Sequence, residues 1–165
     1  MNCVERVLTR RSVRKFKKES IPDIILQNIL EVGRLAPTAT NIQTWHFVIA
    51  RDQKAKEAFS FGGFNKWTSD AAFIVLGLYK ISEVVIEKLS LLDVTIALQN
   101  MVVAAWVQGV GSCWMAAFDD NKLRDTLNLP ADSRIVGAVA CGIPDENPVK
   151  PTKKLLSEIV HFDKW

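Results

Sequence analysis

Apolar positions that recur every three or four residues predict the helices of this chain. Within residues 22–35 they line one helical face, and Pro22 stands where a helix start tolerates its missing N–H. A longer apolar pattern covers residues 93–108 and has the composition of a buried helix. Further helices are expected over residues 2–9, 54–59 and 121–127.

Shorter apolar segments between these helices predict the strands. They are rich in β-branched and aromatic residues and have strand length, and they cover residues 46–50, 71–79, 112–118 and 134–141. Strands and helices mixed at this spacing indicate an α+β or α/β fold around one sheet. A length of 165 residues is most simply one domain, 1–165.

The basic charge of the chain is concentrated at its N-terminus. With 48% apolar and 24% charged residues the composition is that of a soluble globular protein, and a net charge of +3 does not by itself imply nucleic-acid binding. Residues 1–18, however, hold seven cations against Glu5 alone, so that the remaining residues sum to −3. A local excess of this size needs a local explanation.

Residues 10–16, with the sequence RRSVRKF, place four cations and a hydroxyl within seven positions. Arginine forks match phosphate oxygens two at a time, although a cluster of this kind is more often a solvated face. Residues 36–45 and 109–114 add amide side chains, small residues and aromatic rings, which suit a flat polar heterocycle. The three stretches together point to a phosphorylated ring cofactor.

Cysteine and glycine spacing excludes several other classes of site. Cys3, Cys113 and Cys141 are odd in number and widely spaced, which favours reduced thiols in a cytoplasmic protein over a disulfide framework or a metal site. Neither GxGxxG after a first strand nor GxxxxGK[ST] occurs, so that no familiar nucleotide loop is expected.

No membrane segment is expected. The N-terminus lacks the apolar core of a signal peptide. Residues 89–108 have the length of a membrane span, yet they contain Asp93, Gln99 and Asn100, and a buried helix of a soluble protein is the better interpretation.

Six stretches follow one another in a recognisable order: RRSVRKF at 10–16, GRLAPTATNIQTWHF at 33–47, DVTIALQNMVVAAWVQGVG at 93–111, SCWMAAFD at 112–119, CGIPDENPVKP at 141–151 and EIVHFDKW at 158–165. In this order and spacing the chain resembles the FMN-dependent nitroreductase family from end to end. The resemblance implies an α+β fold with a central, mostly antiparallel sheet flanked by helices, and an obligate homodimer with FMN at two sites on the subunit interface.

The resemblance also implies which residues hold the cofactor. Phosphate and ribityl contacts would come from Arg10, Arg11, Ser12 and Arg14, with Lys153 approaching the phosphate from the C-terminal segment. The partner subunit would supply Pro37, Thr38, Ala39, Asn41 and Gln43. The isoalloxazine ring would lie along Trp114, Met115 and Ala116.

The activity that the resemblance implies needs no catalytic side chain and no metal. Hydride would pass from NADH or NADPH through flavin N5 to an electron-poor small molecule, a nitroaromatic or a quinone, with ping-pong kinetics. The protein would contribute position, redox potential and exclusion of water. Arg14 would favour the reduced ring if its guanidinium reached the N1/O2 edge.

Other readings remain open at this point. The chain could be a specialised reductase of quinones, free flavin or an unsaturated bond, or an FMN-binding dimer without turnover. Nucleic-acid binding through the basic segment is disfavoured because a single aromatic residue, Phe16, is interleaved with its cations. Thr44 stands where the family usually has proline, which predicts a less rigid loop. Asn65 and Lys66 lie near a further flavin position of the family but are not assigned.

Overall fold

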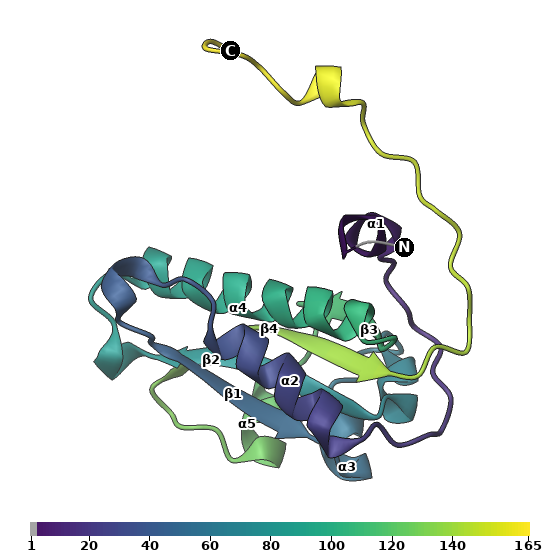
Figure 1. Ribbon diagram of the computed structural model, residues 1–165. Helices are drawn as coiled ribbons and strands as arrows, with labels where there is room; N and C mark the ends of the chain where they lie inside the picture. The colour runs from purple at the N-terminus through teal and green to yellow at the C-terminus, as the bar shows by residue number, and fades with distance from the viewer. Residues whose placement is uncertain (1–2) are drawn as a thin grey trace.

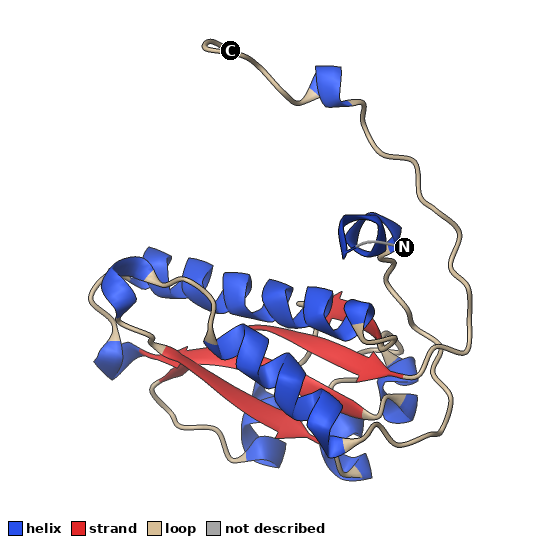
Figure 2. Ribbon diagram, in the orientation of Figure 1, coloured by secondary structure: helices blue, strands red, loops and turns tan. Residues whose placement is uncertain are grey.

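The computed structural model describes residues 3–165, which fold around one antiparallel sheet of four strands (Figures 1 and 2). The strands are β1 (Trp45–Ala50), β2 (Phe73–Lys80), β3 (Gly111–Met115) and β4 (Ser133–Gly142), and they lie in the order β1-β2-β4-β3. Each neighbouring pair is antiparallel. This confirms the predicted α+β fold.

Two helices cover one face of the sheet. They are α2 (Asp23–Arg34) and α4 (Glu87–Val107), which pack closely because α2 carries Gly33 at the contact. A Cβ on Gly33 would lie 2.1 Å from Met101 Cε of α4, so any other residue at this position would require the Met101 side chain to move. The helices and the sheet enclose a core that includes Ile29, Val75 and Leu98.

Two shorter helices lie on the other face, α3 (Gln53–Glu57) and α5 (Asp120–Leu127). Each begins at an aspartate, Asp52 or Asp119, whose carboxylate accepts a hydrogen bond from a backbone N–H of the first turn. A second core forms beneath them, with Phe59 and Leu123 fully buried. The sheet is therefore covered by apolar packing on both faces.

The segments near the two ends of the chain lie outside the layers around the sheet. Helix α1 (Cys3–Thr9) rests against the C-terminal end of α4, where the Arg6 guanidinium donates to the Val107 carbonyl at 2.8 Å. Residues 145–165 run away from the sheet, exposed along almost their whole length (Figure 1). They contain one short 3₁₀ turn, η4 (Leu156–Glu158).

The predicted elements are present, with shifted boundaries. The long helix begins at Glu87, six residues before the predicted Asp93, and the Asp93 carboxylate within it accepts a hydrogen bond from the Ala39 N–H of a neighbouring loop. The third strand ends at Met115, three residues before the predicted Phe118, where β4 ceases to pair with it. Sequence analysis did not predict the short 3₁₀ turns η1 (Ala39–Asn41), η2 (Lys66–Asp70) and η3 (Ile81–Glu83).

Candidate functional site

The basic segment and the start of the tail form the two walls of one cleft of about 600 Å³. Arg10, Arg11, Ser12 and Arg14 line it on one side, and Lys150 and Lys153 line it on the other. Residues 140 positions apart in the sequence therefore meet where the sequence predicted an anion site. The volume falls within the range of ligand pockets, roughly 300–1,000 Å³.

The electrostatics of this cleft strongly favour an anion. Five of its described lining residues are cationic, and no acidic side chain is among them. Arg11 is partly engaged already, since its Nη1 donates to the Arg10 carbonyl at 2.8 Å. Arg14 is exposed, and Arg10 is half-buried.

Strand-like contacts hold the segment that carries these cations. The Val13 N–H donates to the Ser112 carbonyl of β3, and the Lys17 N–H donates to the Ile143 carbonyl beyond β4, both at 2.9 Å. Val13 and Phe16 are buried, so the intervening Arg14 is turned outward. The Glu146 carboxylate accepts from the backbone N–H groups of Arg14 and Lys15, which ties the segment to the root of the tail.

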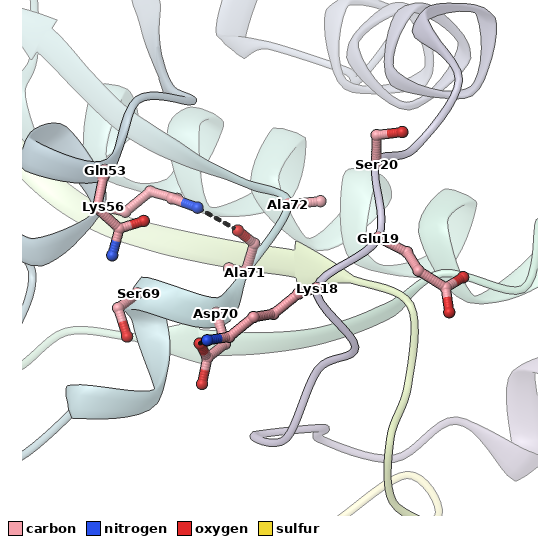
Figure 3. A pocket seen from close by; sticks show the side chains of 9 residues that line it. All are labelled: Lys18, Glu19, Ser20, Gln53, Lys56, Ser69, Asp70, Ala71 and Ala72. Atoms are coloured by element: carbon pink, nitrogen blue, oxygen red, sulfur yellow. Dashed lines mark hydrogen bonds and ion pairs between the residues drawn. The ribbon is translucent and has the colours of Figure 1, made fainter.

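A second cleft, of about 400 Å³, is polar but offers no comparable charge (Figure 3). Its two lysines already have partners. Lys56 Nζ donates to the Ala71 carbonyl at 2.8 Å, and Lys18 Nζ lies 3.9 Å from an Asp70 oxygen. Glu19 adds another carboxylate, so the charges balance. This cleft is not an anion site.

The loop of residues 37–43 presents its amide side chains to solvent. Asn41 and Gln43 are exposed, whereas Thr38 and Ala39 are half-buried. Thr40, Asn41 and Gln43 adopt positive φ of 50°, 58° and 58°, a region that L residues rarely occupy. Thr44, expected to loosen this loop, is buried and donates to Ser90 Oγ of α4 at 2.9 Å.

The three residues predicted along the ring differ in accessibility. The Trp114 indole is half-buried against the backbone of Gly137, where an added Cβ would lie 2.1 Å from Cζ3. The Met115 side chain points to the opposite face of the sheet and is buried in the core, which leaves only its backbone for a ligand. Ala116 is exposed.

The thiol nearest the cleft is poorly suited to nucleophilic chemistry. Burial raises the pKa of Cys113, although Arg14, Ser12 and Arg10 pull the pKa back toward its usual range. Burial also raises the pKa of Cys141 far above its usual range. No cluster of metal ligands occurs within residues 3–165. The chemistry of the site thus depends on what the cations bind.

Helix α1, which contributes to the cleft, and the 37–43 loop lie at opposite ends of α4 (Figure 1). The loop is fixed at Asp93, where the Ala39 N–H donates to the carboxylate, and α1 contacts Val107. Fourteen residues of helix separate these two points, about 21 Å at 1.5 Å per residue. Within one chain the two groups of predicted site residues do not meet.

Comparison with known proteins decides the family. The sequence model of the nitroreductase family matches residues 7–61 and 60–143. The chain belongs to the nitroreductase family.

Relatives of this family member span nearly its whole length. A protein of Archaeoglobus fulgidus, provisionally named NADH dehydrogenase/NAD(P)H nitroreductase, is 30% identical over 99% of the chain and 98% of its own length. The NADPH-flavin oxidoreductase of Vibrio harveyi is 29% identical over 99% of the chain and 75% of its own length.

Solved structures share the fold. The Vibrio harveyi NADPH:FMN oxidoreductase complexed with NAD⁺ superimposes with a TM-score of 0.91 at 23% identity, covering 100% of this chain and 78% of that one. A nitroreductase of Desulfovibrio desulfuricans in complex with FMN gives a TM-score of 0.89 at 24% identity, covering 100% and 98%.

Three polar residues that contribute to the site were not predicted as site residues from the sequence. Lys150 lines the cleft beside Lys153, Glu146 secures the basic segment, and Asp93 holds the exposed loop. Lys150 and Glu146 lie within the matching stretch 141–151, but no pattern in that stretch distinguishes them from their neighbours. Asp93 did carry one, because a carboxylate within an apolar helix needs a partner.

Asn65 lies beside the ring segment of this family member. Its Nδ2 donates to the Ala117 carbonyl at 2.8 Å, next to the exposed Ala116. Lys66 is exposed at the start of η2. Of these two residues left unassigned by the sequence, Asn65 therefore supports the segment that follows β3.

Proposed function

We propose that this chain is an FMN-dependent oxidoreductase that uses NADH or NADPH to reduce an electron-poor small molecule, a nitroaromatic or a quinone. Membership of the nitroreductase family supports the general activity, NAD(P)H-dependent flavin chemistry. The single observation that carries the assignment is the cleft in which Arg10, Arg14 and Lys153 converge.

The residues of this cleft fit the phosphate of FMN. A phosphomonoester carries close to two negative charges near neutral pH, and five cations without a lining carboxylate provide the complementary potential. Arg10 and Arg14 supply bidentate forks, whereas Lys150 and Lys153 act as point charges. Ser12 offers a hydroxyl to the ribityl chain.

When bound, FMN supplies the redox chemistry: it accepts hydride from the nicotinamide and passes two electrons to the acceptor. The residues of the chain bind and orient the cofactor, and they exclude water from the site. Ala116 is exposed at the position expected to face the ring, and the Trp114 indole packs against Gly137 of β4. The buried Cys113 takes no nucleophilic part, because its pKa is raised.

A homodimer completes the proposed site. About 21 Å of α4 separates Asp93, which holds the 37–43 loop, from Val107, which Arg6 of α1 contacts. Asn41 and Gln43 therefore lie at the far end of α4 from the cleft of their own chain and would contact the FMN held by a second copy. Helix α4 is long and apolar enough to cross a membrane, but its inner face packs on the sheet as in the core helix of a soluble protein. Because 44% of its apolar stretch is buried within the chain, the rest of that stretch is available to a partner. Leu91, Leu92 and Ile96 remain exposed for a partner copy.

An absorbance spectrum of the purified protein tests the function. We expect flavin bands, either as purified or after addition of FMN, that bleach within seconds when NADH or NADPH is added without air. Flavin that binds but does not bleach would identify a carrier or sensor. A protein that takes up no FMN would refute the assignment of the cationic cleft.

A further inference from the structure

The carboxylate of Asp93 is buried in an apolar helix and makes one contact outside it. Only 6% of the residue is exposed, and both carboxylate oxygens accept from the Ala39 N–H, at 3.2 and 3.3 Å. Burying a charge is costly unless hydrogen bonds compensate it. The bond to Ala39 therefore has to be maintained, which gives the loop a fixed point on α4.

A second contact from the same face of α4 fixes the other end of the loop. Ser90, one turn before Asp93, accepts the hydrogen bond of the buried Thr44 hydroxyl at 2.9 Å. Within the part of the chain that the structure describes, the hydrogen bonds of Asn41 and Gln43 stay inside residues 38–43, with the Gln43 N–H donating to Thr38 Oγ1 at 3.3 Å. Helix α4 thus holds both ends of the loop by hydrogen bonds, at Ala39 and at Thr44, while Asn41 and Gln43 between them are exposed.

Packing alone does not set the position of this loop. A cavity of about 140 Å³ lies beneath it, lined by Ile86, Leu89 and Val85 as well as by Ser90 and Asp93. Above this cavity, Thr40, Asn41 and Gln43 keep the positive φ values that a free chain rarely adopts. The hydrogen bonds to Asp93 and Ser90 therefore contribute to holding the loop in this conformation.

We propose that Asp93 is a positioning residue: through the Ala39 N–H, its carboxylate fixes the 38–43 loop in the conformation that presents Asn41 and Gln43 to the cofactor of the partner subunit. This inference rests on the proposed function. It assigns no chemistry to Asp93, which lies beneath the loop and does not face the cleft of its own chain.

Two substitutions separate positioning from packing. Asp93→Leu keeps the approximate size but removes the acceptor, whereas Asp93→Asn keeps one acceptor oxygen and removes the charge. We expect the FMN dissociation constant to rise on the order of tenfold for Asp93→Leu and by less for Asp93→Asn. Amide hydrogen exchange of the FMN-free protein should accelerate within residues 38–43 and remain unchanged in β2.

Asp125→Asn is the matched control. It makes the same substitution at an exposed carboxylate of α5, on the opposite face of the sheet, so that affinity and exchange should stay at their wild-type values. Asp93→Leu protein that binds FMN within twofold of wild type would overturn the proposal. So would weaker binding without faster exchange in the loop. If Asp93→Leu does not fold, Asp93→Asn decides by the same two criteria.

The two proposals fail in distinguishable ways. Wild-type protein that takes up no FMN contradicts the proposed function, and then the link between Asp93 and the cofactor falls with it. The exchange measurement, made without FMN, still shows whether Asp93 holds the loop. Normal FMN uptake by wild type and by both Asp93 variants contradicts only the role of Asp93.

Discussion

Arg10 and Arg14 illustrate how much single residues reveal in the sequence. Their density predicts an anion site, and the structure does place them in one cleft with Lys153. The sequence does not distinguish them from Lys18, which belongs to the same basic run but pairs with Asp70 in the neutral cleft. The difference arises because the buried Val13 and Phe16 fix the direction of the backbone between them.

This difference predicts unequal effects of two charge deletions. Arg10→Ala removes a charge-assisted partner of the phosphate and should raise the FMN dissociation constant roughly 10- to 100-fold. Lys18→Ala removes the same charge from the same segment and should leave the constant within twofold. Flavin fluorescence titration at moderate salt measures both, and equal effects would show that only the overall charge of the segment matters.

Elements were predicted well where a repeating pattern defines them. The strands β1, β2 and β4 and helix α2 lie within two residues of their expected bounds, because an apolar period records which face is buried. The 3₁₀ turns escaped prediction, since three to five residues contain no period. The early start of α4 was not predicted either, because its first residues, from Glu87 onward, include Glu87, Lys88 and Ser90 and interrupt the apolar pattern.

The packing of β3 on β4 predicts a strong response at Gly137. Gly137→Ala would bring a Cβ within 2.1 Å of Trp114, whose rigid indole cannot bend aside. We expect a loss of roughly 1–3 kcal/mol in the free energy of unfolding, measured by urea denaturation. In a Trp114→Leu background the same substitution should cost clearly less, and an equal cost in both backgrounds would mean that the indole is not the obstacle.

Several large apolar side chains are exposed on the surface of the molecule. Besides the outer face of α4, the tail leaves Val149, Phe162 and Trp165 fully or largely exposed. Leu91, Leu92 and Ile96 on α4 are a group of exposed apolar side chains of the kind that marks interaction sites. Their exposure agrees with the proposed homodimer, in which both the cleft and the loop would be completed.

A single charge on α4 tests this arrangement. Leu91→Asp places a carboxylate on the exposed face of the helix and should shift the mass measured by analytical ultracentrifugation from two chains toward one, with loss of bound FMN. Asn121→Asp adds the same charge on α5, across the sheet, and should change neither. Leu91→Asp protein that stays dimeric with full flavin would remove α4 from the proposed interface.

By itself, the sequence determined the fold class and the family, and it predicted an anion site at the basic segment, since local periodicity and dense charge are features of consecutive residues. Only the tertiary structure showed which cations share a cleft. It also showed that the Met115 side chain is buried in the core and that Asp93 accepts a hydrogen bond from the loop. It also separated the cleft from the loop by most of the length of α4. These features depend on the direction of side chains and on distances between remote segments, which are fixed only when the elements pack together.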